Sequence, residues 1–291
     1  IINEVDIDTV NNLQRIAVQE SRLGIPLLVG RDVIHGFKTI FPIPLGQAAT
    51  WNPDLVQASA RVAALEASTA GVNWTFAPMI DVTRDPRWGR IAESLGEDPY
   101  LCSQLGAAMV KGFQGEQLDQ HGSIAACAKH FAGYGAVEAG LDYNTTSIPE
   151  IELRNVYLPP FLAAIRAGVA TVMASFTDLN GVPATANQFL MQQVLKEEWN
   201  FKGFVVSDWD SVAQLTVHGF TANDADAALA AASSGINMEM NSRLYDRHLG
   251  AAVASSSLTE AQLDDLVYPI LKTKFQLGLF ENAYRNPDSF P

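Results

Sequence analysis

Six short apolar segments, rich in β-branched residues, recur along the chain with longer helical patterns between them. None of the six alternates hydrophobic and polar positions, which is typical of strands covered on both faces of a parallel sheet. These predicted strands occupy residues 24–30, 73–82, 123–130, 170–176, 203–208 and 236–240.

Helical patterns are predicted between and after these strands. Asn52 is a suitable N-cap ahead of Pro53 at a first helical position, and Thr259 with Gln262 has the spacing of a capping box. The alternation of strands and helices predicts a parallel sheet with right-handed crossovers. The predicted helices occupy residues 8–19, 53–70, 100–114, 150–167, 187–199, 223–234 and 259–277.

The choice between an open sheet and a barrel depends on where the polar clusters lie. An open doubly wound sheet usually carries a glycine-rich phosphate turn, and residues 133–140, GYGAVEAG, lack the third glycine at the required offset. Polar clusters instead follow nearly every predicted strand, as in a (β/α)8 barrel. We therefore predict an α/β chain with a (β/α)8 TIM-like barrel. Six strands are visible, and residues 1–3 add a truncated seventh, so the barrel is incomplete at its N-terminal strand.

Asp208 carries the most weight among the candidate residues. It ends the predicted strand at 203–208 and precedes Trp209, so its carboxylate should leave the sheet and face the central cavity. A capping role for the next helix would suit Asp210 better. An ionised carboxylate beneath a sugar ring is the nucleophile of a retaining glycosidase. Trp209 offers such a ring an apolar face.

Lys129 and His130 end the predicted strand at 123–130. A lysine at this point is either a desolvated Schiff-base amine or a charged donor to substrate hydroxyls. His130 favours the second interpretation, because paired donors suit neighbouring hydroxyls. A histidine alone could equally be a core residue whose hydrogen bonds are satisfied.

Asp32 and Arg90 also follow predicted strands. Asp32 can accept hydrogen bonds from two vicinal hydroxyls, and Arg90 can donate to a hydroxyl or hold a carboxylate in place. Charged residues at strand ends are often only caps or loop ion pairs, and Arg84, Asp85 and Arg87 are candidates for that. Clusters after several successive strands nevertheless favour one shared site.

Composition and charge exclude several classes of protein. The 291 residues are 48% hydrophobic and include 5 Trp and 14 Phe, which excludes a disordered chain. A net charge of −13 makes nucleic acid or an anionic membrane a poor partner. With no apolar run of about 18 residues, we predict no membrane insertion. The five histidines lack metal-ligand spacing, so we predict neither a metal nor a cofactor.

Seven motifs occur together in an order that resembles the barrel domain of glycoside hydrolase family 3, closest to the bacterial β-glucosidases. The resemblance runs from about residue 23 to residue 280. The motifs are GIPLLVGRDVIHG, TIFPIPLG, FAPMIDVTRDPRWGRIAESLGEDP, AKHFAGYGAVEAGLDYN, VMASFTDLNGVPATAN, FKGFVVSDW and SGINMEM.

The resemblance implies a retaining, exo-acting β-glucosidase that hydrolyses terminal β-linked sugars of oligosaccharides or other glycosides. Its covalent intermediate would form on Asp208. The residues that would bind the first sugar are Asp32, Arg90, Lys129 and His130, with Met173 and Trp209 as apolar walls.

The resemblance also implies that the general acid/base is a glutamate of a following sandwich domain, against which this barrel would pack. We expect residues 1–280 to form the barrel and residues 281–291 to begin the linker to that domain. Bacterial relatives of this kind are often periplasmic, so a periplasmic or secreted location is expected.

Three alternatives stay open at this point. The first is a β-xylosidase or another exo-glycosidase of the same family, since the sequence does not fix the sugar. The second is a Schiff-base lyase that uses Lys129. The third is a sugar-binding scaffold without catalytic activity.

Overall fold

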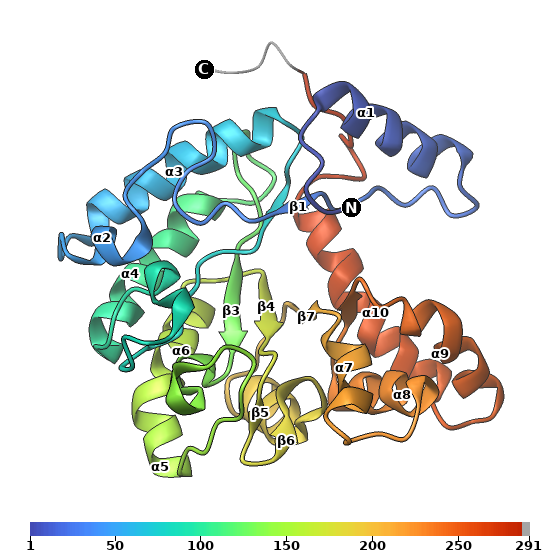
Figure 1. Cartoon of the computed structure of the whole chain (residues 1–291). Helices are drawn as coiled ribbons and strands as arrows, with labels where there is room; N and C mark the ends of the chain where they lie inside the picture. The colour runs from blue at the N-terminus through green and yellow to red at the C-terminus, as the bar shows by residue number, and fades with distance from the viewer. Residues whose placement is uncertain (287–291) are drawn as a thin grey trace.

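The computed structural model describes residues 1–286. Its centre is a curved array of parallel strands (Figure 1), and each strand pairs with or bridges to the next one along the chain. Ile2 bridges to Gly30, and Trp74 bridges to Ala125, so the segments before β1 and β3 join the same array. The strands are β1 (Gly30–Arg31), β2 (Trp74–Thr75), β3 (Cys127–Phe131), β4 (Thr171–Ala174), β7 (Phe204–Trp209) and β8 (Met238–Met240).

Two apolar layers form because successive side chains of a strand point to opposite faces. Cys127 lies in the interior cluster of the array, whereas its neighbours Ala126 and Ala128 pack against the surrounding helices. Trp74 fills the interior, and its indole N–H donates to Thr171 Oγ1 at 2.9 Å. The burial of both faces explains why the strand sequences do not alternate.

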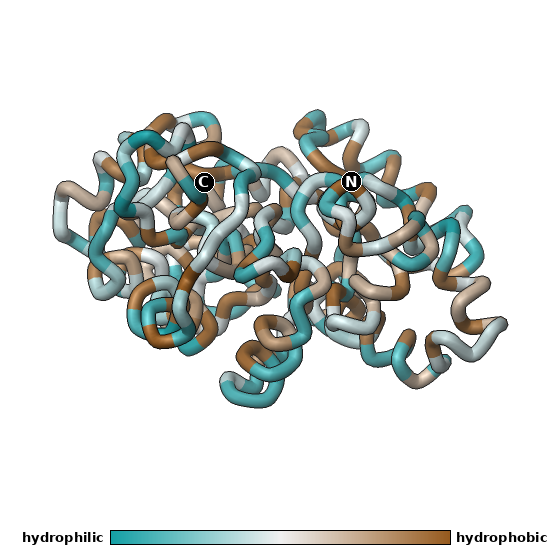
Figure 2. Tube along the Cα trace, turned by 60° about the horizontal axis from the view of Figure 1, so that its bottom comes forward, coloured by the Kyte–Doolittle hydropathy of each residue, from teal (hydrophilic) through white to brown (hydrophobic). Residues whose placement is uncertain are grey.

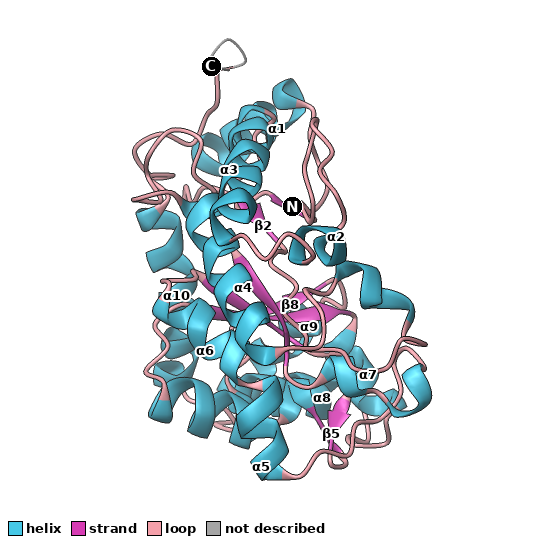
Figure 3. Cartoon of the chain, turned by 90° about the vertical axis from the view of Figure 1, so that its left-hand side faces the viewer, coloured by secondary structure: helices cyan, strands magenta, loops and turns pink. Residues whose placement is uncertain are grey.

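Helices surround the strands, as Figure 3 shows from the side. Hydrophobic and hydrophilic positions are interspersed along these helices (Figure 2), as expected where one face of a helix packs inward and the other faces solvent. α3 and α4 approach closely at Gly112, where a Cβ atom would lie 2.4 Å from the carbonyl oxygen of Gln57. The helices are α1 (Ile7–Arg15), α2 (Pro44–Ala48), α3 (Pro53–Thr69), α4 (Pro99–Gln114), α5 (Glu150–Glu152), α6 (Pro159–Arg166), α7 (Ser211–Val217), α8 (Asp224–Ser234), α9 (Leu244–Ala254) and α10 (Glu260–Gln276).

Helical turns of other types complete the layer. Wider π-type turns form η1 (Ile16–Glu20), η5 (Leu153–Tyr157) and η7 (Phe189–Glu198), and tighter 3-10 turns form η2 (Gly89–Glu93), η3 (Tyr134–Ala136), η4 (Glu138–Gly140) and η6 (Ala184–Ala186). Both predicted caps are present: the Asn52 side chain accepts from two backbone N–H groups, and Thr259 with Gln262 forms the capping box.

Several predicted elements differ from the structure. β7 has the predicted length and is shifted by one residue, whereas the other five predicted strands are shorter in the structure, because only part of each of those apolar runs pairs with a neighbour. The helix predicted at 150–167 is interrupted, since Pro159 and Pro160 start a new helix, α6. A hairpin of β5 (Asp178–Leu179) and β6 (Val182–Pro183) was not predicted, nor were α2 and α9.

The barrel is not closed in the described part of the chain. Seven strand positions follow one another, counting Ile2, and no pairing joins Ile2 to β8. A cavity of about 240 Å³ lies between them, lined in part by Leu28, Met238 and Met240. The fold is therefore an α/β parallel array of TIM-like form with an open seam, and the expected eighth strand is not present among residues 1–286.

The C-terminal part of the described chain returns to α1. Asn11 Nδ2 donates to the carbonyl oxygen of Arg285 at 2.8 Å, and the Arg285 N–H donates to Asn11 Oδ1 at 2.9 Å. The last part of the predicted linker, residues 287–291, lies outside the described residues. Within residues 1–286, every helix is too short or too polar to traverse a lipid bilayer.

Candidate active site

A hollow of about 390 Å³ opens at the carboxyl ends of the strands. This is the end at which parallel barrels carry their functional groups. All seven residues singled out in the sequence line it: Asp32, Arg90, Lys129, His130, Met173, Asp208 and Trp209. Other lining residues include Ile34, Phe76, Glu93, Tyr143, Phe176 and Met240.

The period of two along the strands decides which polar side chains enter this hollow. Lys129 follows Cys127 by two residues in β3, and Cys127 points into the interior of the array. Asp208 follows Phe204 and Val206 by four and two residues in β7, and both also point inward. The same alternation that builds the core therefore delivers a lysine and a carboxylate to one hollow.

Lys129 and Asp32 form an ion pair across two strands. The Lys129 Nζ atom lies 2.6 Å from Asp32 Oδ1, and the lysine side chain is 5% exposed while that of Asp32 is 52% exposed. The pair fixes the lysine as a charged donor at the rim. This favours hydroxyl binding over the Schiff-base interpretation of Lys129, because a protonated amine is not a nucleophile.

Arg90 lies in η2 and is held by Glu93. Its Nε and Nη2 atoms donate to the two carboxylate oxygens at 2.8 and 3.0 Å. The guanidinium also lies 5.6 Å from the ring centre of Tyr134. Burial opposes the charge, but the hydrogen bonds and charge of Glu93 outweigh it, so the pKa of Arg90 is raised. Arg90 is therefore a fixed cation beside Asp208.

Asp208 lies at the end of β7 with its side chain 10% exposed. Oδ1 accepts the backbone N–H of Trp209 at 2.7 Å, and Oδ2 has no hydrogen-bond partner among the described residues. Burial raises the pKa of Asp208 to about 6, against the opposing effects of the Trp209 hydrogen bond and of Lys129 and Arg90. At neutral pH the carboxylate is mostly ionised, with one oxygen available to an electrophile.

His130 is fully enclosed between two carboxyl groups. Its Nδ1 atom lies 2.8 Å from Asp81 Oδ2, and its Nε2 atom lies 3.4 Å from Asp208 Oδ2. Burial, followed by the charges of Arg90 and Lys129, lowers the pKa of His130 well below its usual value. The ring is therefore a neutral, oriented group next to Asp208.

Aromatic and thioether side chains complete the walls. Trp209 is 48% exposed at the mouth, and Met173 is buried in the floor. Tyr143 is also exposed, and its ring lies 4.8 Å from that of Phe176. These apolar surfaces suit the faces of a sugar ring, which are rich in C–H groups.

Asp81 is the site residue that sequence reasoning missed. It follows β2 within an apolar segment, and its side chain is 0% exposed. The available signal in the sequence was a single acidic residue within the apolar run FAPMIDV. Asp210 holds the predicted N-cap position of α7, but its side chain caps no backbone N–H group and accepts from Asn241 Nδ2 at 2.9 Å instead.

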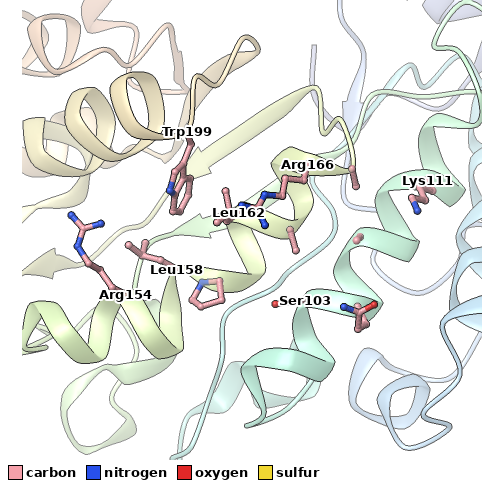
Figure 4. Close-up of a pocket in the computed structure, with 12 residues that line it drawn as sticks. Ser103, Lys111, Arg154, Leu158, Leu162, Arg166 and Trp199 are labelled. Carbon is pink, nitrogen blue, oxygen red and sulfur yellow. The ribbon is translucent and has the colours of Figure 1, made fainter.

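A second hollow of about 630 Å³ lies on the outer wall between α4 and α6 (Figure 4). Lys111, Arg154, Arg166 and Trp199 line it, and it contains no carboxylate and none of the predicted site residues. The predicted site residues therefore all line the smaller hollow at the strand ends. Across the described residues, no group of three or more His, Cys, Asp or Glu has the arrangement of a metal site.

Comparison with models of known protein families shows which family the chain belongs to. The model of the glycosyl hydrolase family 3 N-terminal domain matches residues 1–273. The chain belongs to glycosyl hydrolase family 3. The resemblance inferred from the seven motifs is thereby confirmed.

Individual family 3 members are similar over nearly the whole chain. The "Periplasmic beta-glucosidase" of Salmonella typhimurium is 43% identical over 98% of this chain and 37% of its own length. A "Beta-xylosidase" of Formosa agariphila is 36% identical over 99% of this chain and 43% of its own. The β-glucosidase of Listeria innocua in complex with glucose is 43% identical, with a TM-score of 0.96 over 98% of this chain and 40% of that chain. The chain thus spans well under half of the relatives it matches.

Proposed function

We propose that this chain is the part of a retaining, exo-acting β-glucosidase that binds the terminal sugar and carries the nucleophile. The observation that supports this most is the state of Asp208. Its carboxylate is buried and mostly ionised at neutral pH, and it has an unpaired oxygen in a hollow that Arg90 and Lys129 also line. An Asp208 oxygen attacks the anomeric carbon, and the bond from that carbon to the leaving oxygen breaks. Water later cleaves the glycosyl ester and restores the carboxylate.

The rim residues bind the sugar hydroxyls in this proposal. Asp32 accepts hydrogen bonds from two vicinal hydroxyls of the sugar. The ammonium of Lys129 and the ring of His130 donate hydrogen bonds to neighbouring hydroxyls of the same sugar. Arg90 lies near Asp208 and stabilises its ionised form. Met173 and Trp209 contact the faces of the ring.

The general acid/base comes, in this proposal, from a sandwich domain of the same parent protein that packs over the hollow. Two observations support it. Glu93 lines the hollow but is held in two hydrogen bonds by Arg90, and Glu239 binds Ser242 and lines the cavity at the seam instead. The relatives are also more than twice as long as this chain. A periplasmic or secreted location is proposed with it, supported by the Salmonella relative.

β-Xylosidase activity is the second candidate. Its support is the similarity to β-xylosidases of Formosa agariphila. Glucose carries a hydroxymethyl group where xylose has hydrogen, so matched fluoro-glucoside and fluoro-xyloside reagents distinguish the two. If the xyloside labels the chain faster than the glucoside, the β-xylosidase proposal is supported and the β-glucosidase proposal is refuted.

The central experiment does not require the acid/base. In 2,4-dinitrophenyl 2-deoxy-2-fluoro-β-D-glucoside the leaving phenolate needs no proton, and the fluorine slows breakdown of the ester. We expect intact-mass analysis to find one added fluoroglucosyl group and peptide mapping to place it on Asp208. The variant Asp208→Asn should not be labelled, while ordinary aryl glucosides should be hydrolysed slowly by this chain alone. Labelling of another residue, or none at all, would contradict the proposal.

A further inference from the structure

Asp81 is a buried carboxyl group that does not line the hollow but contacts a residue that does. Its Oδ2 atom accepts the backbone N–H of His130 at 3.0 Å and lies 2.8 Å from the Nδ1 atom of the same residue. Its Oδ1 atom has no hydrogen-bond partner in the described part of the chain. Ser94 Oγ donates to the Asp81 carbonyl oxygen at 2.8 Å and fixes the backbone there.

The other end of the His130 ring faces Asp208. With 3.4 Å between Nε2 and Asp208 Oδ2, the proton on the ring decides whether this contact is favourable. An N–H group there attracts the ionised carboxylate and can donate to a sugar hydroxyl, whereas a lone pair there repels the carboxylate. A proton at Nε2 requires a second proton at the other end of the ring, between Nδ1 and Asp81.

The surroundings of Asp81 and His130 favour this protonated, neutral pair. Burial raises the pKa of Asp81 to about 8, against the hydrogen bond from the His130 backbone, and burial lowers the pKa of His130. An Asp81 carboxyl that keeps its proton can donate it to Nδ1. The titratable and charged groups that face the pair are Arg90 and Glu93 from η2, Lys129 from β3, Cys102 from α4, Tyr134 from η3 and Asp208 from β7.

We propose that Asp81 is a positioning residue that, through the proton it shares with His130 Nδ1, keeps the Nε2–H of His130 directed at Asp208 and at a hydroxyl of the bound sugar. The proposal rests on the function proposed above. Asp81 itself touches neither the sugar nor the reacting atoms. When the pair loses its proton in alkaline solution, Nε2 becomes a lone pair, and the attack by Asp208 slows.

The substitution Asp81→Asn tests this because the backbone dictates how the amide must lie. In the wild type, Asp81 Oδ2 accepts a hydrogen bond from the His130 backbone N–H. If the NH2 group of the asparagine took the place of Oδ2, it would face this N–H, and two donors would meet. The amide oxygen therefore takes this position and also accepts Nδ1–H. This fixes His130 in the tautomer whose Nε2 carries no proton, at every pH where the ring is neutral.

The experiment follows the rate of covalent labelling of Asp208 by the fluoroglucoside from about pH 5.5 to about pH 9.5. The wild-type rate should fall on an alkaline limb near pH 8, where Asp81 loses its proton. Asp81→Asn should react at least about tenfold more slowly at pH 7 and have no alkaline limb. Ser94→Ala is the matched control, because it loosens the same backbone without changing the carboxyl, and it should keep the limb.

A second measurement is independent of reactivity. Nitrogen-15 NMR of the ring should find the proton on Nε2 in the wild type and on Nδ1 in Asp81→Asn. The proposal is overturned if the wild-type ring carries its proton on Nδ1 alone, or if Asp81→Asn keeps both the rate and the limb. If no pH gives labelling of the wild type, the proposed function fails, and the wild-type tautomer still decides the role of Asp81. The same spectrum decides it if the variant does not fold.

Discussion

Lys129 allows the hydroxyl-donor hypothesis to be tested separately from the chemistry of Asp208. The variant Lys129→Met keeps a long, flexible apolar side chain and removes the ammonium. Because the lysine is 5% exposed and the paired Asp32 is 52% exposed, Asp32 regains water when the pair is lost. The ion pair should therefore contribute at most about 1 kcal/mol to stability, and the variant should stay folded.

Binding should respond much more strongly than stability. A hydrogen bond to a charged group contributes about 1.5–3 kcal/mol, which corresponds to a weakening of roughly 10- to 150-fold in Kd. Removing this charge also raises the pKa of Asp208 further, since Lys129 is one of the groups that lower it. The labelling rate near pH 6 should then fall in addition to the loss of affinity.

Titration calorimetry with gluconolactone measures the affinity, because this ligand is neutral and its binding adds no charge to the site. Lys111→Met, the same change on the exposed outer wall, is the control and should leave Kd unchanged. A Kd for Lys129→Met within about twofold of the wild type would refute the donor role. Borohydride trapping of Lys129 with a carbonyl substrate would instead support the lyase alternative.

The remaining predictions concern pH and packing. Because burial raises the pKa of Asp208 to about 6, the labelling rate should fall about tenfold per pH unit below that value; a flat acid limb would contradict this. Native Asp81 keeps its proton up to about pH 8, whereas the unfolded chain releases it near pH 3.9. The free energy of unfolding should therefore decline as pH rises between these values, and it should decline less steeply in Asp81→Asn. Urea titrations at several pH values measure both slopes. Gly135→Ala should destabilise the chain by about 1–3 kcal/mol, because its Cβ would lie 2.1 Å from the carbonyl oxygen of Val82. The Cβ of Gly250→Ala would meet nothing within 4 Å, so this variant should stabilise α9 by about 0.5–1 kcal/mol. Equal urea midpoints for the two variants would contradict the steric argument.

Some departures from the sequence prediction had a local signal. The break in the helix predicted at 150–167 was marked by Pro159 and Pro160, and a proline pair starts a helix more readily than it continues one. The strand lengths had no such signal. Leu28 and Val29 are buried although they lie outside the paired residues of β1, so hydrophobicity alone overestimates the paired length.

The positions of the site residues were largely determined by the sequence. Parallel strands bring their carboxyl ends to one edge, and the period of two gives Lys129 and Asp208 the inward parity of Cys127 and Val206. Residues far apart in the chain could therefore be assigned to one hollow before any contact was known. The family was identified on the same residues, because the motifs that carry the chemistry are those that end the strands.

The tertiary structure alone decided how these groups act on one another. Asp81 and His130 are 49 residues apart, and their contact depends on the register between neighbouring strands. The pKa values of Asp81 and Asp208 depend on burial, which a sequence pattern does not measure. Sequence specifies which side chain lies at which edge because strand geometry is local. Protonation and partner choice depend on the distances and the desolvation that only the packed array creates.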